Sequence, residues 1–281
     1  MNKYIKLARL HSIAPIHLLA LPPIWYVILS FREPMQLLWI ILIAVGAILA
    51  RSAGAIINDI IDRDIDNLVS RTKDRPLTNK SVSLYTAITL TVAILLIILT
   101  LIIVFDITIL PFAILILLFI IIYPFSKRFF IFPQVILGFV YNSGILLIAM
   151  IIPSSNLLQP IILYIGSVFW TIMYDTVYAH QDKDDDRKIK MHSMANSKLG
   201  TKKWLKNFSL ISFSLINLAN IACSGNIISI LLIAIIEYYN SKQLMRCDIN
   251  NKVECSYFFK YQVRIGYFIL CAIIIGRIGR F

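Results

Sequence analysis

The sequence predicts an all-α membrane protein with about nine transmembrane helices, and three observations support this fold class. First, 59% of the 281 residues are hydrophobic. Second, apolar stretches of about eighteen residues or more, long enough to cross a bilayer, recur along the whole chain. Third, basic residues concentrate in alternate connecting segments. The predicted helices span residues 13–31, 36–57, 83–104, 107–124, 133–152, 158–180, 205–223, 226–243 and 258–278.

The first apolar stretch follows three basic residues, an order that also occurs in secretory signal peptides. Prolines interrupt this stretch, and no small-residue cleavage site follows it. We therefore expect residues 13–31 to remain as the first transmembrane helix. The segment before it lacks the Arg- and Ser-rich composition of a mitochondrial transit peptide, which favours a bacterial cell inner membrane.

The basic residues indicate how the helices are oriented. Of the 27 Lys and Arg residues, 24 lie in the N-terminal segment and in every second connection, whereas the connections near 105–106, 153–160 and 224–226 contain none. Because basic residues stay in the cytoplasm, the N-terminus is expected to be cytoplasmic. The net charge of +12 is therefore explained by topology and by contact with anionic lipid, and does not indicate nucleic-acid binding.

The second helix, 36–57, and the sixth, 158–180, differ from the others because carboxylates gather at their predicted cytoplasmic ends. Nine of the 15 Asp and Glu residues fall in these two places. A single acidic segment at a membrane edge is commonly a solvated loop. The second group of carboxylates, at an equivalent position, favours one shared site instead.

The spacing in the first group, NDIIDRDID at 58–66, follows a helical period. If the helix of 36–57 continues through it, Asn58, Asp62 and Asp66 lie on one face and Asp59 lies at the edge of that face. Like charges at this spacing destabilise a helix unless a cation neutralises them. Carboxylate and amide oxygens are ligands that suit Mg²⁺, which commonly shares its coordination with substrate phosphates.

The second group repeats the same step. Asp182 and Asp186 are four residues apart, and Asp175 lies two turns before Asp182. Two carboxylate groups on separate helices that face each other would hold Mg²⁺ against a diphosphate.

Basic side chains that suit such a diphosphate lie close by in the sequence. Arg51 precedes Asn58 by seven residues, within an otherwise apolar helix, where a charge is costly unless it lines a polar cavity. The planar fork of arginine fits carboxylate and phosphate oxygens, so Arg51 could bind either kind of group. The predicted substrate-binding residues are Arg51, Arg71, Arg75, Lys127, Arg128, Tyr178, Lys183 and Lys188.

These motifs resemble those of the UbiA superfamily of intramembrane prenyltransferases. NDIIDRDID resembles its first aspartate motif, and YDTVYAHQDKDDDRKI, at 174–189, resembles the second motif as found in bacterial 4-hydroxybenzoate polyprenyltransferases. RTKDRPL, YPFSKR and PQVILG follow the same subgroup in order. The sequence departs from it at His180, Lys190 and His192, and none of these positions is an aspartate of the motifs.

The resemblance implies a single polytopic domain over 1–281, with the helices around a central cavity. It implies transfer of a polyprenyl group from polyprenyl diphosphate to the ring carbon ortho to the hydroxyl of 4-hydroxybenzoate, in ubiquinone biosynthesis, with Mg²⁺ as cofactor. The implied metal ligands are Asn58, Asp59, Asp62, Asp66, Asp175, Asp182 and Asp186. The implied catalytic residues are Asp62, Asp66, Asp182, Asp186 and Arg128.

Three other functions are compatible with parts of the sequence. A UbiA-type enzyme could prenylate another acceptor, such as haem, dihydroxynaphthoate, homogentisate or chlorophyllide. A cation- or proton-coupled transporter would place its acids near the middle of the membrane, whereas here they lie at helix ends. A phosphatidyltransferase of the CDP-alcohol type would need glycine and arginine between the aspartates of one long motif, an arrangement that NDIIDRDID lacks.

Overall fold

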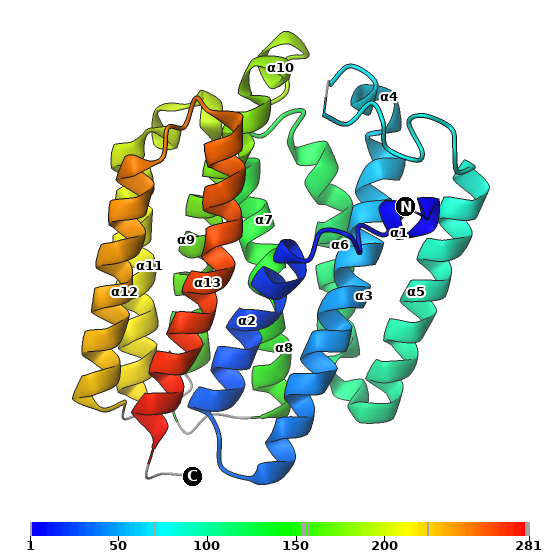
Figure 1. Cartoon of the computed structure of the whole chain (residues 1–281). Coiled ribbons are helices and arrows are strands. Elements are labelled where there is room, and N and C mark those ends of the chain that lie inside the picture. The colour runs from blue at the N-terminus through cyan, green and yellow to red at the C-terminus, as the bar shows by residue number, and fades with distance from the viewer. Residues whose placement is uncertain (1, 70, 153–155, 157, 224, 279–281) are drawn as a thin grey trace.

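The computed structural model describes residues 2–69, 71–152, 156, 158–223 and 225–278. These residues form helices and no strands (Figure 1). The long helices are α2 (Ala14–Leu29), α3 (Leu37–Ile61), α5 (Leu84–Phe105), α6 (Leu110–Ser126), α7 (Pro133–Asn142), α8 (Gly144–Ile151), α9 (Leu158–Ala179), α11 (Lys202–Ala222), α12 (Ile227–Arg246) and α13 (Lys252–Arg277). The short elements are α1 (Lys3–Leu7), α4 (Arg63–Asp66) and α10 (Lys183–Lys188), and the 3₁₀ turns Pro34–Gln36, Ile107–Ile109, His180–Asp182, Met194–Asn196 and Lys198–Gly200.

The all-α prediction is confirmed, and each predicted span coincides with a long helix or, for 133–152, with the pair α7 and α8. In the described part of the chain, seven helical stretches are long and apolar enough to cross a membrane. Helix α2 has 16 residues and is shorter than any of these seven stretches, and α11 is not among them either. The count of nine crossings therefore stays a prediction. Residues 153–155, 157, 224 and 280, which belong to predicted loops or to the C-terminal basic segment, lie outside the described residues.

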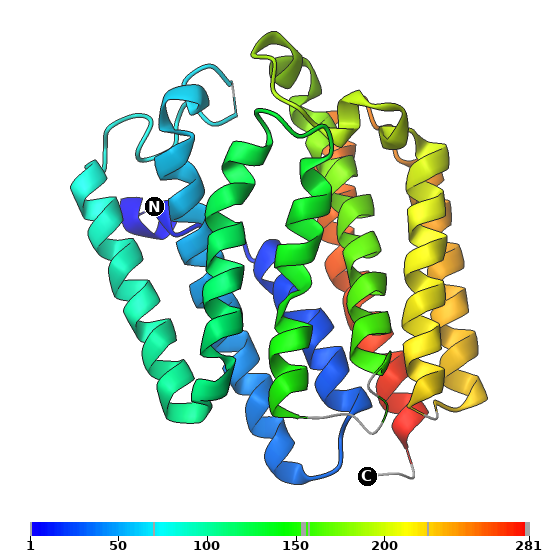
Figure 2. The same ribbon diagram turned by 180° about the vertical axis from the view of Figure 1, so that it is seen from behind.

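The helices form a bundle whose two sides are packed differently (Figures 1 and 2). Helix α9 packs against α7, α11 and α13, and α2 packs against α13. Trp25 of α2 and Trp170 of α9 are fully buried where these helices meet, with ring centroids 5.2 Å apart. Helices α5 and α6 lie on the opposite side and bury only 11% of their apolar stretches, so their aliphatic faces suit contact with lipid.

The segments that carry α4 and α10 lie at the same end of the bundle in both views (Figures 1 and 2). The expectation of one uninterrupted helix through the first aspartate motif is wrong, because α3 ends at Ile61 and Asp62 separates it from α4. The backbone still keeps the helical register: Asp62 N–H donates to the Asn58 carbonyl (2.9 Å), and Asp66 N–H donates to the Asp62 carbonyl (2.8 Å). The four-residue spacing therefore continues across the break.

Candidate functional site

A polar cavity of about 460 Å³ lies at this end of the bundle, between the two aspartate motifs. Side chains from α3, α4, α9 and α13 line it, together with the segment that follows α4. All seven side chains predicted from the two motifs lie in its wall: Asn58, Asp59, Asp62, Asp66, Asp175, Asp182 and Asp186. The fold thus brings together two groups that are more than a hundred residues apart in the sequence.

Arginines neutralise the buried carboxylates of the first motif. Arg9, from the segment before α2, donates a hydrogen bond to Asp59. Arg75 donates to Asp59 at 3.1 Å and to Asp66 at 2.5 Å, so one guanidinium joins both carboxylates. Because Asp59 and Asp66 are buried, these ion pairs compensate charges that would otherwise be costly to remove from water.

Another arginine, Arg71, connects the segment after the first motif with the second motif. The Nε of Arg71 donates to both carboxylate oxygens of Asp182, at 2.9 and 3.0 Å, and its Nη2 donates to the same group. The guanidinium also lies 5.6 Å from the ring centroid of Tyr178, within range of a cation–π contact. Arg71 therefore fixes the segment after the first motif against the carboxylate of the second.

Asp62 lies between an amide and a further arginine. The side chain of Asn58 donates to Asp62 at 3.1 Å, as their four-residue spacing predicts. The Nη2 of Arg128 lies 3.5 Å from Asp62 and 3.2 Å from the carbonyl of Ile61. Arg128 itself is not part of the cavity wall and reaches the site through Asp62.

The burial of these ion pairs shifts their pKa values. Burial raises the pKa of Asp66, and the positive charge of Arg75 opposes that rise. The pKa of Arg75 is lowered, first by burial and then by the neighbouring cation Arg9. Burial alone would lower the pKa of Arg71, but the hydrogen bonds with Asp182 and nearby negative charge raise it overall. Arg71 therefore remains a cation at any physiological pH.

The chemistry of the donor set suits a magnesium ion. Among the described residues, no three His, Cys, Asp or Glu side chains lie close enough together to hold a metal, and Asp66 and Asp182 pair with arginines. Carboxylate oxygens from both motifs and one amide nevertheless face a single cavity, and these are the hard oxygen ligands that Mg²⁺ prefers. The residues therefore fit such an ion.

The predicted substrate-binding residues are only partly brought together. Five of them line the polar cavity: Arg51, Arg71, Arg75, Lys127 and Tyr178. Lys183 and Lys188 do not line it, and the exposed Lys188 instead pairs with Asp185 of the same helix at 3.5 Å.

Three cations in the cavity wall are not among the predicted site residues: Lys6, Arg9 and Lys260. Lys6 and Arg9 belong to the N-terminal basic segment that indicates topology, and Lys260 of α13 lines the cavity from the far end of the chain. No motif spacing connects these three residues with the aspartates, so only the packing of distant segments identifies them.

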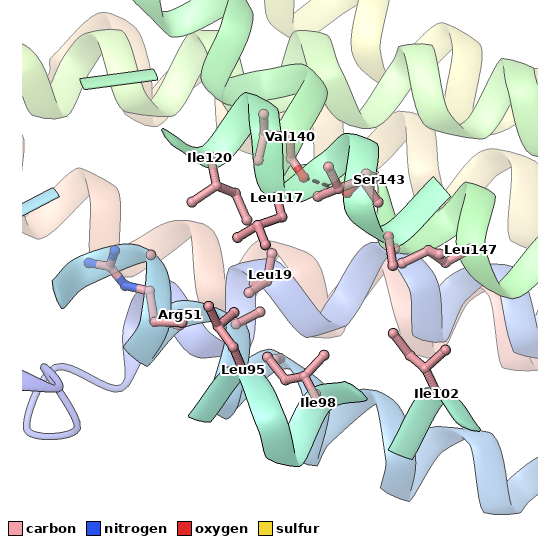
Figure 3. Close-up of a pocket in the computed structure, with 18 of the residues that line it drawn as sticks. Leu19, Arg51, Leu95, Ile98, Ile102, Leu117, Ile120, Val140, Ser143 and Leu147 are labelled. Carbon is pink, nitrogen blue, oxygen red and sulfur yellow. Dashed lines mark hydrogen bonds between the residues drawn. The ribbon is translucent and has the colours of Figure 1, made fainter. Parts of the chain in front are cut away.

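A larger, mostly apolar cavity of about 800 Å³, shown in Figure 3, shares lining residues with the polar one. Aliphatic side chains of α3, α5, α6, α7 and α8 line it, with Arg51 at one end and Ile102 and Leu147 towards the other. Six residues line both cavities and mark their junction: Arg9, Arg51, Asn58, Tyr123, Leu137 and Tyr141. The Nε of Arg51 is buried there without a hydrogen-bond partner.

The chain is an all-helical membrane bundle in which a cavity lined by carboxylates and arginines adjoins an apolar one, so that a charged group and a lipid chain could bind side by side. Residues 19–270 match the model of the UbiA prenyltransferase family. The chain belongs to this family and is a multi-pass membrane prenyltransferase.

Two relatives are similar over most of the chain. A protein named 4-hydroxybenzoate octaprenyltransferase, from Francisella tularensis subsp. tularensis, is 33% identical over 228 residues, which are 80% of either chain. A mitochondrial 4-hydroxybenzoate polyprenyltransferase from Drosophila pseudoobscura is 32% identical over 280 residues, 98% of this chain and 70% of the relative.

Solved structures share the fold at lower identity. The apo structure of a UbiA homolog from Aeropyrum pernix K1 has a TM-score of 0.74 at 22% identity, over 93% of this chain and 97% of the other. A UbiA homolog from Archaeoglobus fulgidus, bound to GPP and Mg²⁺, has a TM-score of 0.66 at 16% identity, over 97% and 99% of the two chains.

Proposed function

We propose that the protein transfers a polyprenyl group from polyprenyl diphosphate to the ring carbon ortho to the hydroxyl of 4-hydroxybenzoate, in ubiquinone biosynthesis at a bacterial inner membrane. The junction of the polar and apolar cavities at Arg51 is the observation that carries this proposal. Charged groups that suit a diphosphate lie there beside an apolar space that suits its tail. The names of the relatives support 4-hydroxybenzoate as the acceptor. We take residues 1–281 as one domain.

The diphosphate would occupy the polar cavity. Asn58, Asp62, Asp66, Asp182 and Asp186 would hold Mg²⁺, with Asp59 and Asp175 close by. When bound, Mg²⁺ would neutralise charge on the diphosphate oxygens. A magnesium-bound relative of the same fold supports this choice of cofactor.

The arginines would stabilise the charge that develops as the donor ionises. Arg71 and Arg75 already lie in the cavity wall, held by Asp182 and by the first-motif carboxylates. Donors held in place before reaction lose little energy to reorganisation, which makes them effective at stabilising a departing anion. Lys127, also in the wall, adds a third positive charge.

In the reaction, the bond between the allylic carbon and the diphosphate oxygen breaks, and its electron pair leaves with the diphosphate. The ring carbon ortho to the phenol forms the new bond to the allylic cation, and loss of the proton from that carbon restores aromaticity. The apolar wall next to Arg51 keeps water from the cation. Arg51, with its unpaired buried Nε, would bind the carboxylate of the acceptor.

The test uses purified full-length protein with Mg²⁺, geranyl diphosphate and 4-hydroxybenzoate, with prenylated product quantified by chromatography. We expect Asp62→Ala and Asp182→Ala to lose at least about a hundredfold in rate, because each removes a ligand from one side of the diphosphate site. Asp64→Ala and Asp184→Ala are matched controls, since both side chains are exposed and neither lines the cavity. Wild-type rates for both cavity variants would refute the two-motif site.

A further inference from the structure

The apolar cavity has different aromatic residues at its two ends. Tyr123 and Tyr141 line both cavities and lie at the polar junction. Trp39 and Phe105 line only the apolar cavity. The remaining apolar lining is aliphatic, so these four rings are the bulkiest side chains along the space.

Helix α3 gives the depth at which Trp39 lies. Trp39 and Arg51 are 12 residues apart on this continuous helix, and Trp39 and Asn58 are 19 residues apart. At a rise of 1.5 Å per residue, these separations correspond to about 18 Å and about 28 Å. Phe105, the last residue of α5, lies beside Trp39.

Trp39 and Phe105 form an aromatic pair at this far end. Their ring centroids are 6.1 Å apart with an interplanar angle of 65°. A hydrocarbon chain needs about 3.5–4.0 Å to the carbon atoms on each of its sides, so it cannot pass between these two rings. Phe105 is 41% exposed, so the pair lies where the cavity meets the surface of the protein.

The length of a prenyl tail can be compared with this depth. Each extended isoprene unit contains four carbon–carbon bonds of about 1.5 Å and spans roughly 4–5 Å. A tail that starts near Arg51 therefore reaches the aromatic pair with about its fourth unit, and one that starts near Asn58 with about its sixth. A two-unit geranyl tail ends well before the pair, and an eight-unit octaprenyl tail extends past it.

We propose that the aromatic pair Trp39–Phe105 determines the donor-length preference of this enzyme, because it blocks the straight path of a tail and forces longer tails to turn towards the lipid. The inference rests on the proposed function, since it assigns the apolar cavity to the donor tail. The pair would contact only the distal isoprene units of the donor tail, far from the carbon that reacts.

The experiment measures kcat/KM of the purified full-length enzyme with geranyl, geranylgeranyl and octaprenyl diphosphates, at saturating 4-hydroxybenzoate. We expect Trp39→Ala and Phe105→Ala to raise the octaprenyl-to-geranyl ratio at least about threefold, with the geranyl value within about twofold of wild type. Conversely, Ile102→Trp adds bulk to the wall about one turn before Phe105, and we expect it to lower the ratio. Trp39→Leu gives a milder test if the alanine variants do not fold.

Leu38→Ala and Val104→Ala are matched controls, because each is an exposed neighbour of one member of the pair and neither lines the cavity. An unchanged or lowered ratio in Trp39→Ala, Phe105→Ala and Trp39→Leu would overturn the inference, as would equal increases in the controls. These results leave the proposed function intact, because it requires only that the wild-type enzyme makes prenylated 4-hydroxybenzoate. A wild-type protein that yields no product with any donor would refute the proposed function itself.

Discussion

At the scale of single residues, Asp59 has a different environment from its neighbours in the motif. It accepts hydrogen bonds from both Arg9 and Arg75, and its side chain is almost fully buried. The spacing of the motif places it at the edge of the ligand face, as an implied metal ligand. The ion pairs suggest that it instead positions two arginines beside the ligands.

This view predicts the behaviour of Asp59→Asn. The change keeps the shape of the side chain but leaves two partly buried guanidinium groups without their shared anion. We expect it to lower the free energy of unfolding by about 3–5 kcal/mol even without Mg²⁺, the usual cost of breaking a buried ion pair. Thermal unfolding of the purified protein in detergent, with exposed Asp64→Asn as control, measures the effect. A variant as stable as wild type without Mg²⁺ would favour a role as metal ligand alone.

Arg51 gives a second prediction at this scale. In Arg51→Gln the acceptor carboxylate would lose a charge-assisted hydrogen bond worth about 1.5–3 kcal/mol, so we expect KM for 4-hydroxybenzoate to rise roughly ten- to hundredfold. The KM for geranyl diphosphate should stay within about twofold. Steady-state kinetics, with each substrate varied in turn, measures the two KM values separately. A rise confined to the donor KM would assign Arg51 to the diphosphate.

Much of the site could be predicted at residue level because carboxylates four residues apart identify a helical face. Asn58 and Asp62 are in direct contact as that spacing requires. Arg9 could not be predicted, since it contacts Asp59 across 50 residues of sequence and its basic neighbours suit a topology signal equally well. Its contact depends on how the segment before α2 folds back onto α3.

At the scale of helices, the lengths of the apolar stretches predicted the long helices well, but the break between α7 and α8 involves side-chain hydrogen bonds. The hydroxyl of Ser143 donates to the Val140 carbonyl at 2.7 Å, where α7 gives way to α8. Such a local bond competes with the helical backbone bond. Asn142 donates to Thr171 on α9 at 2.8 Å, which ties the break to the centre of the bundle. Hydropathy contains no information about either contact.

A buried chain of polar side chains connects four helices. Trp170 of α9 donates to Gln262 of α13 (2.9 Å), Gln262 donates to Asn240 of α12 (3.0 Å), and Asn240 donates to Ser209 of α11 (3.0 Å). All four side chains are fully buried. Hydrogen bonds of this kind hold helices together where lipid provides no hydrophobic driving force.

We therefore expect Gln262→Leu to destabilise the bundle, because it leaves the Trp170 Nε1–H without its acceptor and the Asn240 Oδ1 without its donor. The expected loss is about 1–3 kcal/mol. Unfolding in mixed detergent, followed by tryptophan fluorescence, measures it, and Gln243→Leu on the partly exposed end of α12 serves as the control. Equal stabilities of the two variants would show that the chain of hydrogen bonds contributes nothing measurable.

At the scale of the whole molecule, the predicted orientation places both aspartate motifs, α4 and α10 in the cytoplasm. We expect Cys introduced at the exposed Asp64, in a background without the four native cysteines, to react with a membrane-impermeant maleimide only after the cells are opened. Cys introduced at Thr108, in the turn between α5 and α6, should react in intact spheroplasts. The reverse pattern would contradict the cytoplasmic N-terminus.

The central claim is that the two aspartate motifs form one magnesium-dependent prenyl-transfer site. Its most direct test is the rate at which purified protein forms prenylated 4-hydroxybenzoate from geranyl diphosphate before and after chelation of divalent metal. The account predicts that chelation abolishes product formation, that added Mg²⁺ restores it, and that Asp182→Ala stays inactive in both conditions. Product formation at the wild-type rate without divalent metal would contradict it.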